Sequence, residues 1–157
     1  MPRTSGERAG PSPPTRLAVL IDTNVLLDVI LDRAPWADDA TGLLDLVARG
    51  AVRGYIAAHA VTTVHYLVER ERGRTAAVTA VSDLLQLLHV VALGPADFQR
   101  ALALGLKDFE DAVQVAACLQ VGAAFLVTRN PRDFRDAPIA CRSAGEVLAL
   151  ATLAAEP

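Results

Sequence analysis

The sequence predicts a three-layer α/β fold, with a central parallel sheet of four to five strands and helices on both faces. Short apolar runs alternate along the chain with longer stretches in which apolar residues recur at helical spacing. Pairs of such helical stretches separate the first four runs, which provides the long crossovers that parallel strands require. Hydrophobic residues make up 52% and charged residues 21% of the 157 residues, as is typical of a globular domain.

The first half of the chain is expected to contribute a tail, two strands and four helices. Residues 1–16 are rich in Pro, Gly, Ser and Arg, so a flexible tail is expected before one domain over residues 17–157. The run 17–21 is apolar throughout, as in a parallel strand covered on both faces. Thr23 or Asn24 is expected to cap the next helix. The other elements expected here are a helix over 38–48, a strand over 54–58 and helices over 60–72 and 75–88.

The second half is expected to continue the same alternation. Pro95 fits the first turn of a helix, Gly122 fits the stop of another, and Ser143 fits the cap of the closing helix. The elements expected here are strands over 89–93, 124–127 and 139–141 and helices over 95–104, 107–121 and 143–155.

Charge and apolar run lengths exclude several classes of function. The net charge is −3, so the chain does not bind nucleic acid through a polybasic surface, although an enzyme that meets RNA through a metal remains open. No apolar run approaches the roughly 20 residues that cross a membrane, and the N-terminus lacks the apolar core of a secretory signal. A cytoplasmic protein without a membrane partner is expected. Cys118 and Cys141 are expected to be free thiols in the core.

Acidic and amide side chains occur at three places beside the expected strand ends. Asp22 directly follows the first strand, Asp108 and Asp111 begin the helix before the fourth strand, and Asn130 follows the fourth strand. Each also has a simpler interpretation. Asp22 and Asp108 fit helix caps, Asp111 fits a first-turn acid, and Asn130 before proline fits an ordinary turn.

A metal site is predicted if the fourth strand lies beside the first. The side chains then meet at one edge of the sheet, at the switch point where open α/β sheets bind their ligands. Two carboxylates about 4 Å apart repel by about 4 kcal/mol at an effective dielectric constant of about 20, so a convergent set needs a cation. Oxygen ligands favour Mg²⁺ or Mn²⁺, which polarise a phosphodiester and activate a bound water.

Three motifs occur in a distinctive order and spacing: IDTNVLLD at 21–28, KDFEDAVQVAAC at 107–118 and VTRNPRDF at 127–134. Over about residues 17–147 the chain resembles the PIN-domain ribonucleases, which include the VapC-type toxins of bacterial toxin–antitoxin pairs. The resemblance implies a PIN-like fold and endonucleolytic cleavage of RNA by a water that Mg²⁺ or Mn²⁺ activates. It also implies a cognate antitoxin protein and a homodimer as partners.

The resemblance implies roles for individual residues. Asp22, Asp111 and Asp108 match the metal carboxylates, and Asn130 completes the catalytic set at a position where many PIN domains carry Asp. Supporting or substrate-binding roles are implied for Thr23, Asn24, Thr128, Arg129 and Asp133. A second departure concerns the helix after the second strand, where many PIN domains carry Glu. That helix has Thr62, Thr63 and His65, with Glu69 one turn further on.

Two other functions stay open at this stage. One is a PIN-like scaffold that binds RNA or a partner protein with an incomplete acid set. The other is a haloacid-dehalogenase-like phosphatase, which also begins with Asp after a first strand but needs a second Asp where Asn24 stands. Asp28 is expected to support the fold, and Trp36 to pack against its neighbours.

Overall fold

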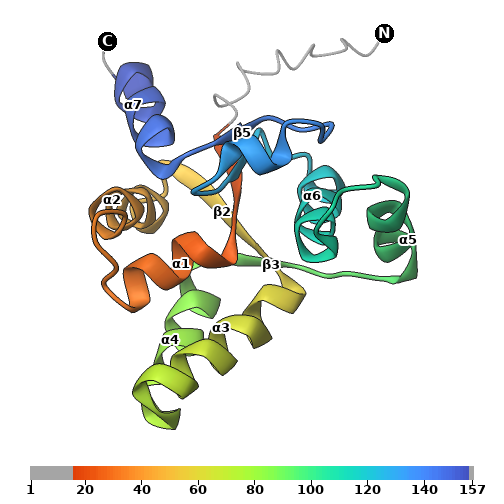
Figure 1. Cartoon of the computed structure of the whole chain (residues 1–157). Coiled ribbons are helices and arrows are strands. Elements are labelled where there is room, and N and C mark those ends of the chain that lie inside the picture. Colours follow the sequence, from red (N-terminus) through yellow and green to blue (C-terminus); the bar gives the residue numbers. More distant parts are fainter. Residues whose placement is uncertain (1–15, 156–157) are drawn as a thin grey trace, which may run out of the picture.

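The core of the fold is a five-stranded parallel sheet in the order β3-β2-β1-β4-β5 (Figure 1). The structure, a computed structural model, describes residues 16–155; apart from Arg16, the expected tail lies outside the described residues. The strands are β1 (Leu17–Ile21), β2 (Val52–Ala57), β3 (His89–Val91), β4 (Phe125–Val127) and β5 (Cys141–Arg142). The predicted parallel sheet is confirmed.

Helices cover both faces of this sheet and confirm the three-layer arrangement (Figure 1). On one face α2 packs against α7 and β2, and on the other α6 packs against β1 and β4 under a cover of α5. The helices α3 and α4 pack against each other, and α3 also contacts α1. The helices are α1 (Thr23–Ile30), α2 (Ala37–Ala48), α3 (Ala58–Arg72), α4 (Arg74–Leu87), α5 (Pro95–Ala103), α6 (Phe109–Val121) and α7 (Ala144–Ala155), with a short 3₁₀ helix η1 (Pro131–Phe134).

Burial follows the apolar patterns in the sequence. Val19, Leu20 and Ile21 of β1 are all fully buried, as expected for a central strand covered on both faces. In α6 seven consecutive residues, 112–118, are buried, because this helix lies between the sheet and α5. Burying one large aliphatic side chain stabilises the fold by about 1.5–3 kcal/mol, so these elements fix the centre of the molecule.

Several element boundaries differ from the expected ones. β2 begins at Val52, two residues early, and β3 ends at Val91, two residues early. β5 lies at Cys141–Arg142 instead of 139–141, because its register is set by pairing with β4. The expected cap of α1 at Thr23 or Asn24 is wrong. The cap position is Asp22, which has an extended backbone and a carbonyl that accepts from the N–H groups of Val25 and Leu26.

β4 lies beside β1, which is the condition for the predicted site, and this pairing creates the switch point of the sheet. Ile21 is paired with Val127, and the backbone N–H of Asp22 donates to the carbonyl of Val127 at 2.9 Å. β2 and β3 are added in turn on one side of β1, and the chain then returns to add β4 and β5 on the other side. Residues that follow β1 and β4 therefore share one edge of the sheet.

Two further expectations about the chain can be compared with the structure. Cys118 is buried and Cys141 half-buried, and both are free thiols as predicted. Burial raises the pKa of Cys118 to about 12 and that of Cys141 to about 11. Between residues 16 and 155, no helix has the length and apolar character needed to cross a membrane.

Candidate active site at the carboxyl edge of the sheet

Asp22 is a buried acid at the centre of the carboxyl edge. It directly follows β1, and only 7% of its surface is exposed. Burial raises the pKa of Asp22, and the hydroxyl of Thr128 opposes that rise. A carboxylate in such surroundings is ionised at a cost unless positive charge or hydrogen-bond donors compensate.

Two neutral side chains hold the carboxylate of Asp22. Thr128, the first residue after β4, donates from Oγ1 to Oδ2 of Asp22 at 3.0 Å. Gln114 of α6 donates from Nε2 to Oδ1 of Asp22 and to Oγ1 of Thr23, both at 3.3 Å. Gln114 is 1% exposed, and its Oε1 has no hydrogen-bond partner in the described part of the chain. Donors from β4 and α6 therefore orient both oxygens of Asp22.

The beginning of α6 adds an acidic cluster to this edge. Asp108 caps the helix, with Oδ1 accepting from the backbone N–H of Asp111 at 3.2 Å, so the capping interpretation is confirmed. The pKa of Asp111 is raised to about 6, first by burial and then by the charges of Asp108, Asp22, Asp133 and Glu110. Carboxylates that follow β1, that begin α6 and that lie in η1 therefore all raise the pKa of Asp111.

The turn after β4 is linked to Asp22 through Thr128. The backbone N–H of Asn130 donates to Oγ1 of Thr128 at 3.3 Å, so this hydroxyl lies between Asn130 and Asp22. The side chain of Asn130 is exposed, as is that of Asp133, whose N–H donates to the carbonyl of Asn130 at 3.0 Å. Asn24 is exposed in the first turn of α1.

Arg129 is bound to Asp28. Its Nε donates to Oδ2 of Asp28 at 2.7 Å, and its Nη2 pairs with Oδ1 of the same carboxylate. Asp28 is 1% exposed in α1, and the guanidinium lies over the ring of Trp36, 4.0 Å from its centroid. Two donors of Arg129 are therefore used within the protein, and its supporting or substrate-binding role stays a prediction.

His59 lies where the second strand meets this edge. It is in the first turn of α3, and its Nε2 lies 3.7 Å from Oε1 of Glu110. Burial lowers the pKa of His59, and the charge of Glu110 opposes this effect. Three other residues of this helix, Thr62, Thr63 and His65, stand where many PIN domains carry Glu, and each has a different contact. Thr62 and Thr63 donate to the carbonyl of His59, and His65 lies 3.6 Å from the exposed Glu69.

The side chains at this edge fit a hard divalent cation. Asp22, Asp108 and Asp111 offer oxygen atoms, and none of the three forms an ion pair within residues 16–155. In the same part of the chain, no three His, Cys, Asp or Glu side chains already surround a common point closely enough to hold a metal. Mg²⁺, however, is usually bound through one or two carboxylates and keeps several waters, so it does not require three converging acids.

The sequence matches the PIN domain family over residues 18–132, so the chain belongs to this family. The fold is similar to that of VapBC2 from Rickettsia felis, with a TM-score of 0.65 and 15% identity over 81% of this chain and 98% of that one. For VapBC from Salmonella typhimurium the TM-score is 0.65 and the sequence identity 16%, over 82% of this chain and 98% of that one. A third similar structure is that of VapC20 from Mycobacterium tuberculosis, a toxin that cleaves the sarcin–ricin loop. Its TM-score is 0.57 and its sequence identity 17%, over 69% of this chain and 86% of that one. No curated protein matches the chain.

Sequence reasoning missed two residues of this edge. Gln114 carries a signal that could have revealed it, because it is a polar residue three positions after Asp111 in an otherwise apolar helical segment. His59 follows the second strand by two residues, which places it at the same edge as Asp22. Gln114 lies within the motif at 107–118, although the resemblance gave it no role, whereas His59 lies outside all three motifs.

Proposed function

We propose that this protein is a metal-dependent endoribonuclease that hydrolyses RNA phosphodiester bonds, and that it is the toxin of a type II toxin–antitoxin pair. The observation that supports the proposal is that Asp22 directly follows β1 at the switch point of a PIN-domain sheet and that its charge, with that of Asp108, raises the pKa of Asp111. The RNA-cleaving activity in the description of VapC20, a protein of the same fold, supports RNA as the substrate.

In this proposal Asp22, Asp111 and Asp108 would hold Mg²⁺ or Mn²⁺, and Asn130 would complete the catalytic set. When bound, the ion supplies a Lewis acid for the phosphodiester and lowers the pKa of a coordinated water. Oxygen ligands without a thiol or imidazole suit these ions better than zinc.

The protein's own residues orient the carboxylate of Asp22. Thr128 and Gln114 donate to the two oxygens of Asp22 and so fix its rotamer, and their hydrogen bonds favour the charged form. Because Asp22 is buried, its interaction with a cation is stronger than it is in water. Thr23, Asn24 and Asp133 surround this core, and Thr23 shares the amide donor of Gln114.

The proposal includes partners and a compartment. A small antitoxin protein is expected to neutralise the nuclease, as the pairing in the VapBC structures suggests. Its reading frame is expected beside that of the nuclease, and co-expression is expected to restore the growth that the nuclease alone arrests. The proposal also includes a homodimer and a cytoplasmic location. Sedimentation of the purified protein measures whether the homodimer forms.

RNA cleavage with Mg²⁺ or Mn²⁺ is the deciding measurement. Asp22→Asn and Asp111→Asn are each expected to lower the cleavage rate by more than about a hundredfold. Losing a group that only orients a metal ligand costs about 10–100-fold, and here the ligand itself loses its charge. Asp45→Asn, at an exposed position of α2, serves as the matched control and keeps the rate. Cleavage that survives both site substitutions contradicts the assignment of the site.

Metal binding is measured separately from cleavage. Because an ion that binds the folded state stabilises it, Mn²⁺ is expected to raise the melting temperature of the wild type and of Asp45→Asn but not of Asp22→Asn. RNA binding without cleavage under any metal condition favours the scaffold alternative. The phosphatase alternative lacks its second carboxylate, because Asn24 stands two residues after Asp22.

A further inference from the structure

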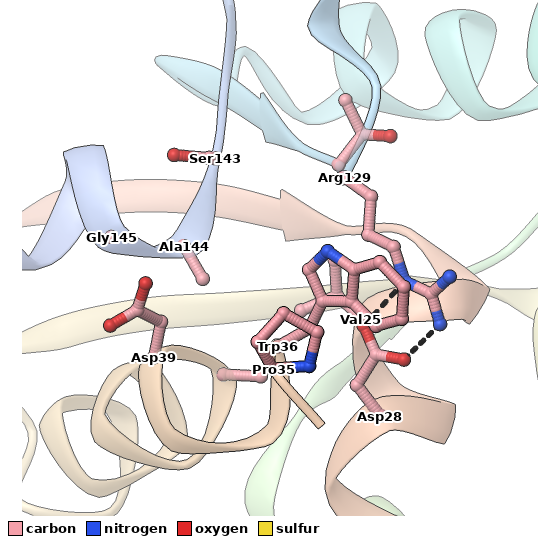
Figure 2. Close-up of a pocket in the computed structure, with 11 residues that line it drawn as sticks. Val25, Asp28, Pro35, Trp36, Asp39, Arg129, Ser143, Ala144 and Gly145 are labelled. Carbon is pink, nitrogen blue, oxygen red and sulfur yellow. Dashed lines mark hydrogen bonds and ion pairs between the residues drawn. The ribbon is translucent and has the colours of Figure 1, made fainter. Parts of the chain in front are cut away.

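A cavity of about 290 Å³ lies beside the carboxyl edge of the sheet (Figure 2). It is lined by α1, the loop before α2, the first turn of α2, the turn after β4 and the beginning of α7. The side chains that give it chemical character are those of Trp36, Asp39, Thr128, Arg129 and Ser143. None of its aromatic or hydroxyl groups belongs to the proposed metal ligands.

One wall of the cavity is an aromatic ring stacked with a cation. Trp36 is 45% exposed, and the guanidinium of Arg129 lies 4.0 Å from the centroid of its ring. Figure 2 shows this guanidinium turned toward Asp28, which binds it through two hydrogen bonds. The pair is thus held in place before any ligand arrives. Rings and guanidinium planes of this kind are the surfaces on which proteins stack the bases of single-stranded RNA.

Another part of the lining, at Asp39, is polar and can accept hydrogen bonds. Asp39 is exposed, and a side-chain carbon placed on Gly145 would lie 2.7 Å from Oδ2 of Asp39. The glycine therefore lets the first turn of α7 approach this carboxylate closely. A carboxylate accepts hydrogen bonds from the N–H groups on the edge of a base. The cavity combines a stacking wall with an acceptor for the edge of the stacked group.

Thr128 connects this cavity to the acidic cluster. It lines the cavity and at the same time donates from Oγ1 to Oδ2 of Asp22 at 3.0 Å. A group in the cavity is therefore separated from Asp22 by one side chain. The volume lies at the lower limit for small-molecule sites, which suits one flat ring system better than a helix or a folded segment of a partner.

We propose that the cavity receives one unpaired base of the RNA strand, adjacent to the phosphodiester held at the acidic cluster. The base stacks on Trp36, and Asp39 accepts hydrogen bonds from its edge. The inference rests on the proposed ribonuclease function and adds to it a binding site for one base of the substrate strand. It also assigns Trp36 and Asp39 to substrate binding and gives neither residue a part in the cleavage step.

The protein's single tryptophan makes the test direct, because all of its tryptophan fluorescence comes from Trp36. The wild type in EDTA, and Asp111→Asn in Mg²⁺, are titrated with a short single-stranded oligoribonucleotide under these two non-cleaving conditions. Saturable quenching is expected in both. Inorganic polyphosphate of similar charge carries no bases, so it is expected to leave the fluorescence unchanged.

A variant series measures the contribution to affinity with a labelled oligoribonucleotide followed by anisotropy. Trp36→Ala is expected to weaken binding about tenfold, as the loss of one stacked base does, and Trp36→Phe to retain binding within about twofold. Tyr66→Ala, which removes an exposed aromatic residue of α3 outside the cavity, is the matched control. Asp39→Ala provides a second test that leaves the stack of Trp36 and Arg129 intact.

The outcomes separate this inference from the proposed function. Unchanged fluorescence at saturating RNA, or full affinity in both Trp36→Ala and Asp39→Ala, overturns the base-binding cavity whether or not the wild type cleaves RNA. Base-dependent quenching by a protein that cleaves no RNA under any metal condition supports the cavity and rejects the nuclease. Equal quenching by polyphosphate assigns the signal to charge alone and also overturns the inference.

Discussion

Arg129 and Asp28 form a two-point ion pair that ties the turn after β4 to the interior of α1. Their positions differ by 101 residues, and the aspartate is almost completely buried. The pair holds the turn that begins with Thr128 and leads to Asn130. The geometry of the acidic edge therefore depends on a contact that lies outside it.

Arg129→Met is expected to lower the free energy of unfolding by about 3–5 kcal/mol, because it leaves the charge of Asp28 buried and unpaired. Combining it with Asp28→Asn is expected to recover part of this loss, because the buried charge is then removed as well. Urea unfolding measures both. Arg132→Met, at an exposed position of η1, is the control and changes stability by no more than about 0.5 kcal/mol. An equally small effect of Arg129→Met contradicts the structural role.

Gln114→Leu is expected to weaken Mn²⁺ binding by about 10–100-fold, the usual cost of losing a group that orients a metal ligand. Leucine fills the buried position but cannot donate to Asp22 or Thr23. Calorimetric titration with Mn²⁺ measures the effect, with Gln86→Leu on the exposed face of α4 as the control. Unchanged affinity in Gln114→Leu means that Asp22 is oriented without the amide.

Thr128→Val removes the hydroxyl that donates to Asp22 and accepts from the N–H of Asn130. Because this hydrogen bond opposes the rise in the pKa of Asp22, its loss is expected to raise that pKa further. The acid limb of the cleavage profile then moves to higher pH. Thr128→Ser keeps the hydroxyl and is expected to restore the wild-type profile. A profile that does not move in the valine variant rejects this role for Thr128.

The raised pKa of Asp111 predicts how stability depends on pH in the absence of metal. Its pKa is about 6 in the folded protein, above the value of about 3.9 for an unfolded aspartate. Folding therefore favours the protonated form, and this stabilisation is complete below about pH 4 and lost as the pH rises through about 6. The free energy of unfolding in EDTA is expected to fall over this interval, and less steeply in Asp111→Asn.

Urea unfolding in EDTA between about pH 4 and pH 8 provides this comparison. Asp136→Asn, at an exposed position after η1, is the control and keeps the wild-type slope. A divalent ion binds the ionised carboxylate, so Mn²⁺ affinity is expected to rise over the same interval. Identical pH dependence in the wild type and Asp111→Asn contradicts the assignment.

Most of the fold could be predicted because burial follows local apolar patterns. The strand 17–21 and the helix after Asp38 were predicted within one residue, since each has an unbroken or periodic apolar set. β2 was harder, because Gly54 resembles a boundary although it lies inside the strand. A side-chain carbon on Gly54 would lie 2.6 Å from Leu88, so the glycine permits a close contact that no local pattern reveals.

The acidic positions of the site could be predicted from their places beside strand ends, whereas their partners could not. Position and residue type indicated Asp22 and Asp111 as candidates, and their role as metal ligands stays a prediction of the resemblance. Gln114, His59 and the partner of Arg129 depend on which elements the fold brings together. Gln114 contacts Asp22 across 92 residues of sequence, a pairing that only the packing of α6 against β1 produces.

The hydrogen bond between Thr128 and Asp22 spans 106 residues of sequence and has a consequence for synthesis on the ribosome. Domains are made from the N-terminus, so Asp22 emerges early, while β4 and Thr128 emerge after most of the chain. Until then β1 lacks β4 as its second neighbouring strand, and the carboxylate lacks one of its two side-chain donors. A nascent chain that ends before β4 therefore lacks the complete edge at which the activity is proposed.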